Sequence, residues 1–183
     1  MRDNVEMPNE QTGSSPMTDG ERYRARLMDY VKDKDPLAMQ RETPATLAGL
    51  VEALPAGKLK QPPAPGKWSI GQILAHLAEA ELASSWRYRQ MIDRSGAPLS
   101  AFDQAEWARL GAYDSRDPRE SLELFRLLRE ANLRMFSKLT PEEWQRFGMH
   151  AERGRMTVKD LVSQVAGHDL SHIEQVRRIS AAI

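Results

Sequence analysis

Apolar residues recur every three or four positions in four long segments of the chain, which is the spacing of amphipathic helices. This pattern predicts helices over residues 44–54, 70–94, 118–139 and 157–180. A further amphipathic segment, residues 18–31, precedes them. No segment shows a convincing alternation of apolar and polar residues, the pattern of a half-buried strand. We therefore predict an all-α fold, most simply an up-and-down four-helix bundle.

Residues at the expected helix ends support these boundaries. Ser69 is a favourable N-cap for the second bundle helix, and Asp117, followed by proline, begins the third. The sequence Thr-Val-Lys-Asp from Thr157 resembles a capping box at the start of the last helix, with aspartate in place of glutamate. Residues 99–116 are predicted to form a long connection between the second and third bundle helices, with a short helix near 103–110.

Two segments are predicted to lack regular structure. Residues 1–17 contain glycine, serine, proline and asparagine without periodicity, so we predict a flexible N-terminal tail followed by one bundle domain over 18–183. Residues 150–155 are predicted to be a polar loop. The N-terminal segment lacks the apolar core of a signal peptide, and no stretch approaches the roughly 20 apolar residues that span a bilayer. These features predict a cytoplasmic protein that does not enter a membrane.

The composition narrows the function further. Lysine plus arginine and aspartate plus glutamate both number 26, so no basic surplus indicates a nucleic-acid partner. The chain has no cysteine, which excludes disulfides, thiolate metal ligands and a cysteine nucleophile. No Gly-x-Ser-x-Gly motif, P-loop or dinucleotide-binding fingerprint occurs, so the sequence does not support serine-hydrolase, ATP or NAD chemistry.

Three of the four histidines are predicted to lie inside the bundle. His168 and His172 are four residues apart and therefore stack on one face of the last helix, on its apolar stripe. His76 lies on or beside the apolar stripe of another predicted helix. A His-x-x-x-His pair alone is a weak signal, but burying three imidazoles without partners is costly. A shared cation removes this cost, so we predict that the three side chains bind one divalent metal ion.

Three interpretations of these histidines remain open. Three nitrogen ligands with open coordination positions are typical of a catalytic metal site, which activates water or polarises a substrate atom. Alternatively, the ion stabilises the bundle or a dimer without catalysis. In the third interpretation no metal binds, and Glu79 or a similar group forms hydrogen bonds with the histidines. Solvent access distinguishes the first two, because a structural site is closed by protein.

Other polar residues are candidates for roles around this site. Glu79, three residues after His76, is the candidate proton shuttle or hydrogen-bond acceptor for a ligand, with a solvated helix face as the alternative for it and for Glu81. Arg129 is the candidate anchor for an anionic substrate group, with a buried salt bridge or a solvent-exposed position as the alternatives. His150 is the candidate substrate contact at the edge of the pocket, with an exposed loop position as the alternative. Asp169 is expected on the surface.

Five motifs occur in order along the chain: Pro-Gly-Lys-Trp-Ser-Ile at 65–70, His76 with two following glutamates, Phe-Asp-x-x-x-Trp at 102–107, His-x-x-x-Gly-x-x-Thr at 150–157, and His-Asp-Leu-Ser-His at 168–172. Together they resemble the DinB superfamily of metalloenzymes. The similarity spans roughly residue 40 to the end. It implies a four-helix bundle, often a homodimer, in which His76, His168 and His172 bind nickel, zinc or a similar ion.

The resemblance also bears on the activity. Family members with known activities include metal-dependent hydrolases and transferases or isomerases that use low-molecular-weight thiols. We therefore predict a metal-dependent enzyme that activates water for hydrolysis or a thiol for transfer, acting on a small molecule. The alternative is a non-catalytic metal-binding stress-response or structural module.

Overall fold

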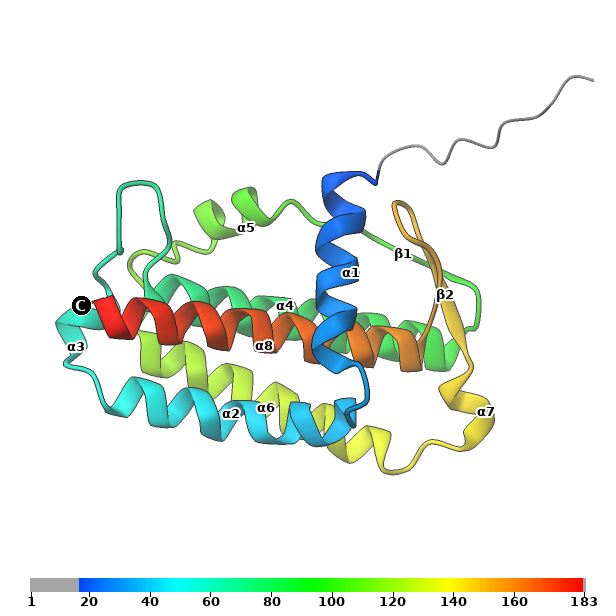
Figure 1. The fold of residues 1–183 in the computed structure, drawn as a ribbon. Helices are drawn as coiled ribbons and strands as arrows, with labels where there is room; N and C mark the ends of the chain where they lie inside the picture. The colour runs from blue at the N-terminus through cyan, green and yellow to red at the C-terminus, as the bar shows by residue number, and fades with distance from the viewer. Residues whose placement is uncertain (1–16, 183) are drawn as a thin grey trace, which may run out of the picture.

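Four long helices form a bundle in the computed structural model, which describes residues 17–182 (Figure 1). The predicted tail at residues 1–17 lies outside the described residues except for Met17. The bundle helices are α2 (Pro36–Glu52), α4 (Ile70–Asp93), α6 (Pro118–Phe136) and α8 (Val158–Ala182). The predicted four-helix bundle and its long connection between the second and third bundle helices are confirmed.

The connection between α4 and α6 sets the direction of the second half of the bundle. A side chain at Gly71, at the start of α4, would touch Pro118 at the start of α6, whereas Tyr88 packs on Phe136 near the ends of both helices. These two helices therefore run parallel, and the chain returns along the bundle between them (Figure 1). The helices do not alternate strictly in direction, because a long connection can return the chain to the end where the previous helix began.

A small sheet lies at the end of the bundle where α4 and α6 terminate (Figure 1). Strand β1 (Ala97–Leu99) pairs in parallel with β2 (Phe147–His150), and β2 pairs antiparallel with β3 (Gly154–Thr157). The expectation that no strand would form was wrong. Strands of three or four residues are too short to show a reliable alternation of apolar and polar residues, and their pairing depends on contacts between segments distant in sequence.

Helix α2 begins eight residues before its predicted start at Pro44. Asp35 caps the helix by accepting a hydrogen bond from the Leu37 amide, and a proline occupies the first turn. Pro44 lies inside the helix, where it has no N–H to donate to the carbonyl of Gln40. Arg129 of α6 donates to that carbonyl instead, at 3.1 Å. The proline is tolerated because a side chain from another helix replaces the lost hydrogen bond.

Helix α1 (Asp19–Val31) crosses α8 instead of joining the bundle (Figure 1). The crossing requires Gly167, since a Cβ there would lie 2.2 Å from the backbone oxygen of Leu27. Any larger residue at this position would push α1 away from α8. Gly167 directly precedes His168, so this contact positions α1 over the middle of the bundle.

Three short helices complete the fold, and two apolar clusters fill the ends of the bundle. The short helices are α3 (Ala56–Leu59), α5 (Gln104–Leu110) and α7 (Pro141–Trp144). One cluster contains Leu47, Val51, Ile73, Leu74, Phe125, Ile173 and Val176, and the other contains Tyr88, Met91, Phe136, Leu161 and Val162. On each bundle helix, buried polar residues separate the positions that belong to the two clusters. A polar layer therefore crosses the middle of the bundle.

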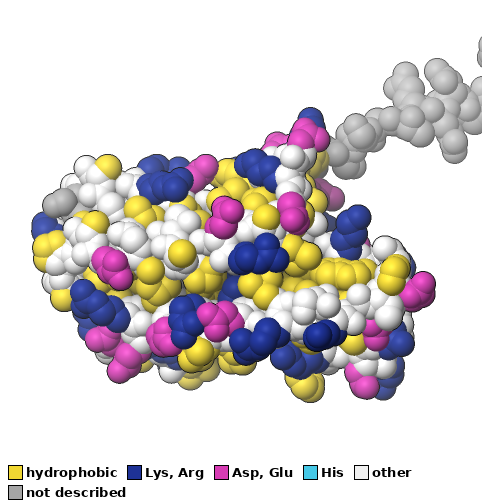
Figure 2. Space-filling model, turned by 90° about the horizontal axis from the view of Figure 1, so that it is seen from below, with side chains coloured by type: hydrophobic (Ala, Val, Ile, Leu, Met, Phe, Trp, Pro, Cys, Tyr) yellow, Lys and Arg dark blue, Asp and Glu magenta, His cyan; other side chains and the backbone are white. Residues whose placement is uncertain are grey.

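The exterior has an ordinary mixture of charged and apolar side chains. Figure 2 shows lysine, arginine and acidic residues interspersed on one face, and no histidine of the described chain is visible there. Within residues 17–182, no helix is both long and apolar enough to cross a membrane.

Candidate metal centre

The imidazoles of His76, His168 and His172 converge in the polar layer between α4 and α8. The Nε2 atom of His168 lies 3.0 Å from Nε2 of His76 and 3.2 Å from Nε2 of His172. One nitrogen from each residue can be chosen so that all three lie within 4.8 Å of one another. The predicted convergence of these side chains is therefore present in the structure. It arises because His168 and His172 are one helical turn apart and face His76 on the antiparallel helix.

Burial favours the uncharged form of all three rings. It lowers the pKa of His76 to about 3 and that of His172 to about 4, and the pKa of His168 lies well below its ordinary value for the same main reason. The side-chain oxygen of Gln175 can only accept, so the Nδ1–H of His172 donates to it at 3.0 Å. This hydrogen bond leaves the Nε2 lone pair of His172 facing the other two rings.

This donor set fits a divalent transition metal. Neutral imidazole nitrogens are common ligands of zinc, nickel and related ions. Three lone pairs brought together repel one another unless protons or a cation lie between them, and the lowered pKa values disfavour the extra protons. The amide of Gln175 fixes the ring orientation and tautomer of His172 in the way that outer hydrogen-bond partners do in metal sites.

A cavity of about 130 Å³ gives access to this centre. His76 and His168 line it at one end, together with Glu81 and Asp169. The cavity continues between α4 and α8 and is bordered by Tyr23 from α1. The histidine cluster is therefore not enclosed by protein on all sides, which is the arrangement expected of a catalytic site rather than a closed structural one.

Glu79 lies beside the centre but faces away from its cavity. Its carboxylate accepts hydrogen bonds from the Tyr113 hydroxyl at 2.9 Å and from Arg116 at 2.6 Å. Tyr113 packs edge-on against Trp68, whose ring centroid lies 5.2 Å from that of His76. Glu79 thus holds an aromatic wall behind His76. Its predicted role as a proton shuttle remains a prediction, and these contacts favour a positioning role.

Arg129 forms the centre of a buried ionic cluster next to the histidines. Its guanidinium donates two hydrogen bonds to Glu81, at 2.9 and 3.0 Å, and one to Asp169 at 2.7 Å. Asn132 also donates to Glu81, at 2.7 Å. Burial opposes the charge of Arg129, but the two carboxylates raise its pKa above the ordinary value. With the bond to the Gln40 carbonyl, four hydrogen bonds engage this side chain, which matches the structural alternative for Arg129.

The expected surface position of Asp169 was wrong, and so was the solvated face for Glu81. Both residues are 2% exposed. The sequence contained a signal for Asp169, because it follows Val162 and Ala166 and precedes Ile173 at the spacing of a buried stripe. Charge on an apolar stripe indicates a buried partner, and Arg129 provides it.

His150 lies in strand β2 and is 4% exposed, so it is not part of the predicted polar loop. Its Nδ1 accepts a hydrogen bond from the backbone N–H of Glu152 at 3.2 Å. Burial lowers its pKa, and the nearby charges of Arg153 and Arg87 lower it further. The side chain of His150 does not border the cavity, whereas Arg153 and Arg87, whose charges lower its pKa, do. Its predicted substrate contact remains a prediction.

The histidine pKa values predict acid sensitivity of the metal-free protein. Above pH 6.5, the ordinary histidine value, both folded and unfolded states hold neutral rings. Below it, the unfolded chain binds protons that His76 and His172 cannot bind until their folded pKa values of about 3 and 4. The free energy of unfolding should therefore fall by up to about 1.4 kcal/mol per pH unit for each residue as pH decreases from 6.5 toward 5.

Urea unfolding with a metal chelator present, measured at several pH values, checks this prediction. The double variant H76Q/H172Q should show a shallower dependence on pH than the wild type. An identical slope in the two proteins would contradict it.

A helical bundle with three converging histidines and an open cavity defines the class of this protein, which is that of small helical proteins with a candidate metal site. The DinB superfamily model matches residues 40–176, and the chain belongs to this family. The proposed metal-dependent hydrolase YfiT of Bacillus subtilis is 24% identical over 160 residues, which cover 86% of this chain and 90% of YfiT. A proposed metal-dependent hydrolase of Oceanobacillus iheyensis is 27% identical over 112 residues, covering 61% of this chain and 64% of that protein.

Solved structures show the same fold. The structure of YfiT, described as having an unusual four-helix bundle topology, superimposes with a TM-score of 0.74 at 21% identity and covers 96% of this chain and 92% of its own. The mycothiol-dependent maleylpyruvate isomerase superimposes with a TM-score of 0.56 at 10% identity, covering 80% of this chain and 58% of its own. The family and fold predicted from sequence are thus confirmed.

Proposed function

We propose that this protein is a metal-dependent hydrolase of small molecules, with the ion held by His76, His168 and His172. The observation that carries the proposal is that three neutral imidazoles converge at the end of an open cavity. The metal-dependent hydrolase names given to its relatives are consistent with this reading. The donor set suits zinc or nickel, since imidazole binds both.

When bound, such an ion would polarise a substrate carbonyl or increase the acidity of a coordinated water. The protein residues would bind the ion on one side and leave the other side to substrate. Gln175 orients His172 through its Nδ1–H, and the ring of Trp68 packs against His76. The salt bridges of Arg129 keep the carboxylates of Glu81 and Asp169 in place at the cavity wall. The proposed role of Arg129 is therefore positioning.

A purely structural ion is the less favoured alternative. A structural site is normally closed by four protein ligands. Among the described residues, the group that could hold a metal ion consists of three histidines, and two of them border a cavity. Homodimerisation and a cytoplasmic location remain predictions from the sequence.

Thiol-dependent transfer is the second candidate. The observation that favours it is the shared fold of the mycothiol-dependent maleylpyruvate isomerase. In this alternative a low-molecular-weight thiol would occupy the open side of the metal centre, where a soft thiolate is a favourable ligand for zinc.

The two candidates make different predictions. We expect the zinc- or nickel-loaded protein to hydrolyse p-nitrophenyl acetate at least tenfold faster than the metal-free protein, as befits general metal activation of water. H168A should remove this difference, whereas H150A should retain the metal. Equal rates with and without metal would contradict the hydrolase.

The cobalt-substituted protein tests thiol transfer separately. Cysteine added to it should change the visible spectrum of cobalt if thiols bind the ion, and leave the spectrum unchanged if they do not.

E79Q should lower hydrolysis without loss of metal if Glu79 is the proton shuttle. If Glu79 only positions the Trp68 wall, E79Q and Y113F should have similar effects.

A further inference from the structure

The cavity extends from the histidines toward a second, strongly basic end. Along α4 it is lined from His76 to Arg87, which are eleven residues apart, or about 16 Å of helical rise at about 1.5 Å per residue. Along α8 it is lined from Leu161 to Asp169. The space is therefore an elongated groove with the candidate metal centre at one end.

Two arginines line the end of the groove away from the metal ligands. Arg87 is 8% exposed, donates to the Ser100 carbonyl at 2.5 Å and lies over the ring of Phe102. Arg153 enters from the turn between β2 and β3. The Ser100 carbonyl and the Phe102 ring hold the Arg87 guanidinium at the wall of the groove, which both Arg87 and Phe102 line.

Among the described residues, neither arginine forms an ion pair with a carboxylate. Within residues 17–182, no carboxylate lies within salt-bridge distance of Arg87 or Arg153, and Glu152 beside Arg153 makes no ion pair with it. The two carboxylates that do line the groove, Glu81 and Asp169, are both bound to Arg129.

The positive charges at this end also act on one another. Burial lowers the pKa of Arg87, and the charge of Arg153 lowers it further. Burial and the charge of Arg24 lower the pKa of Arg153 in the same way. Glu152 offsets part of this effect on Arg153, but among the described residues neither arginine has an ion-pair partner. A part-buried pair of like charges of this kind is unfavourable in the free protein. An anion between the two side chains would relieve it and would accept hydrogen bonds from two planar guanidinium groups.

We propose that the groove binds its substrate through an anionic oxygen group, a carboxylate or phosphate, held by Arg87 and Arg153 at the end opposite the metal ligands. This inference rests on the proposed function for the identity of the other end. The walls between the ends include Leu77, Leu161 and Val165. The substrate class is therefore an elongated molecule with an apolar middle, an anionic group at one end and the reacting group at the other.

The basic end can be tested without metal. Hexanoate, hexyl phosphate and the neutral hexanamide share an apolar chain and differ in charge. Isothermal titration of the metal-free protein should show at least one of the two anions binding roughly ten- to hundredfold more tightly than the amide, the usual range for a charge-assisted hydrogen bond. The preferred anion identifies the group. Equal binding of the three probes, or no binding of any, would overturn the proposal.

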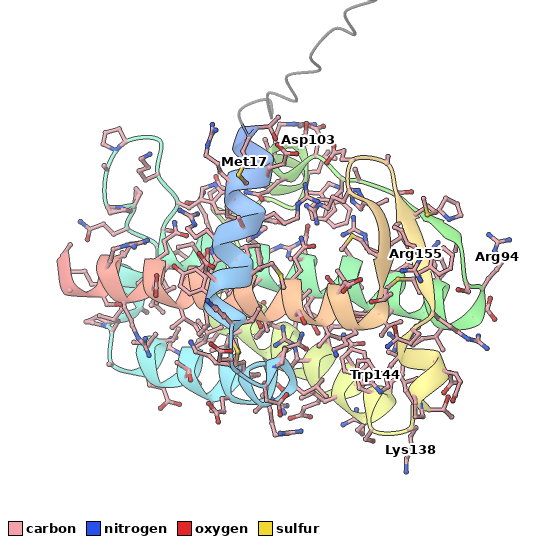
Figure 3. All side chains as sticks on the ribbon, turned by 45° about the vertical axis from the view of Figure 1, so that its right-hand side comes forward. Met17, Arg94, Asp103, Lys138, Trp144 and Arg155 are labelled. Atoms are coloured by element: carbon pink, nitrogen blue, oxygen red, sulfur yellow. The ribbon has the colours of Figure 1, made fainter. Side chains whose placement is uncertain are left out.

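Substitutions of the two arginines test whether these residues bind the anion. R153Q and R87Q should each reduce the preference for the anion by roughly tenfold. R153Q is the more decisive, because the Arg153 side chain has no ion pair in the described part of the chain to lose. The matched control is R155Q on strand β3, since Arg155 packs over Phe147 and does not line the groove. Figure 3 labels Arg155 on the sheet at the end of the bundle. An equal loss in R155Q would overturn the assignment, and circular dichroism reports whether each variant folds.

A second experiment tests whether one ligand binds both the metal ion and the basic end of the groove. Zinc-loaded protein should bind mercaptohexanoate more tightly than mercaptohexanamide, and R153Q should remove that difference while leaving zinc content unchanged. If no zinc binds but hexanoate or hexyl phosphate still binds the wild type more tightly than R153Q, the proposed metal-dependent function is wrong and the anion site is supported. If zinc binds but the anions show no preference, the metal centre stands and this inference fails.

Discussion

We expect the substitution H168A to reduce metal content from about one equivalent per chain to almost none. The Nε2 atom of His168 lies 3.0 Å from Nε2 of His76 and 3.2 Å from Nε2 of His172. Its removal leaves only two of the three candidate ligands, without the nitrogen that lies next to both. Loss of an outer hydrogen-bond partner alone costs about 10- to 100-fold in affinity, and loss of a ligand should cost more than about 100-fold. Elemental analysis and zinc titration of untagged protein measure this.

The matched variants are H76A and H150A. H76A should lose the metal as H168A does, because its imidazole comes from the opposite helix of the same cluster. H150A should keep it, since His150 lies in the sheet and is not part of the cluster. Retention of one equivalent in H168A, or its absence from the wild type after incubation with zinc and nickel, would disprove the shared site.

The second large effect is expected from R129M. This change leaves Glu81 and Asp169 buried without their cation, and it removes the donor to the Gln40 carbonyl freed by Pro44. Breaking one side of a buried ion pair typically destabilises a protein by about 3–5 kcal/mol. Burial raises the pKa of Asp169 to about 6 even though the charge of Arg129 lowers it. The charged form of this carboxylate is therefore already disfavoured before the arginine is removed. Urea unfolding of the metal-free protein gives the change in the free energy of unfolding.

Two controls separate this effect from the loss of an ordinary arginine. R126M removes a half-exposed arginine whose partners, Glu123 and Glu130, lie on the same helix, and it should change stability little. The triple variant R129M/E81Q/D169N should recover part of the loss, because it removes the unpaired charges together. A loss in R129M no larger than in R126M would show that the buried cluster is not a stabilising element.

The sequence determined the helical parts of the fold because their signals are local. Apolar spacing predicted the bundle, and residues next to the helix ends predicted its boundaries at Ser69, Asp117 and Thr157, whose caps are present in the structure. Helix α2 was predicted too short because Pro44 is a helix breaker by local rules. Its tolerance depends on Arg129, which lies 85 residues away in the chain.

The convergence of the three histidines was also predictable, because a pair on one helix and a third on another apolar face leave few places for three imidazoles. Its surroundings were not. The ion pairs of Arg129, the strand around His150 and the basic end of the groove all require knowing which helices pack together and in which direction. Periodicity tells which face of a helix is buried, whereas tertiary packing alone decides which buried side chains meet, because each contact joins segments far apart in the chain.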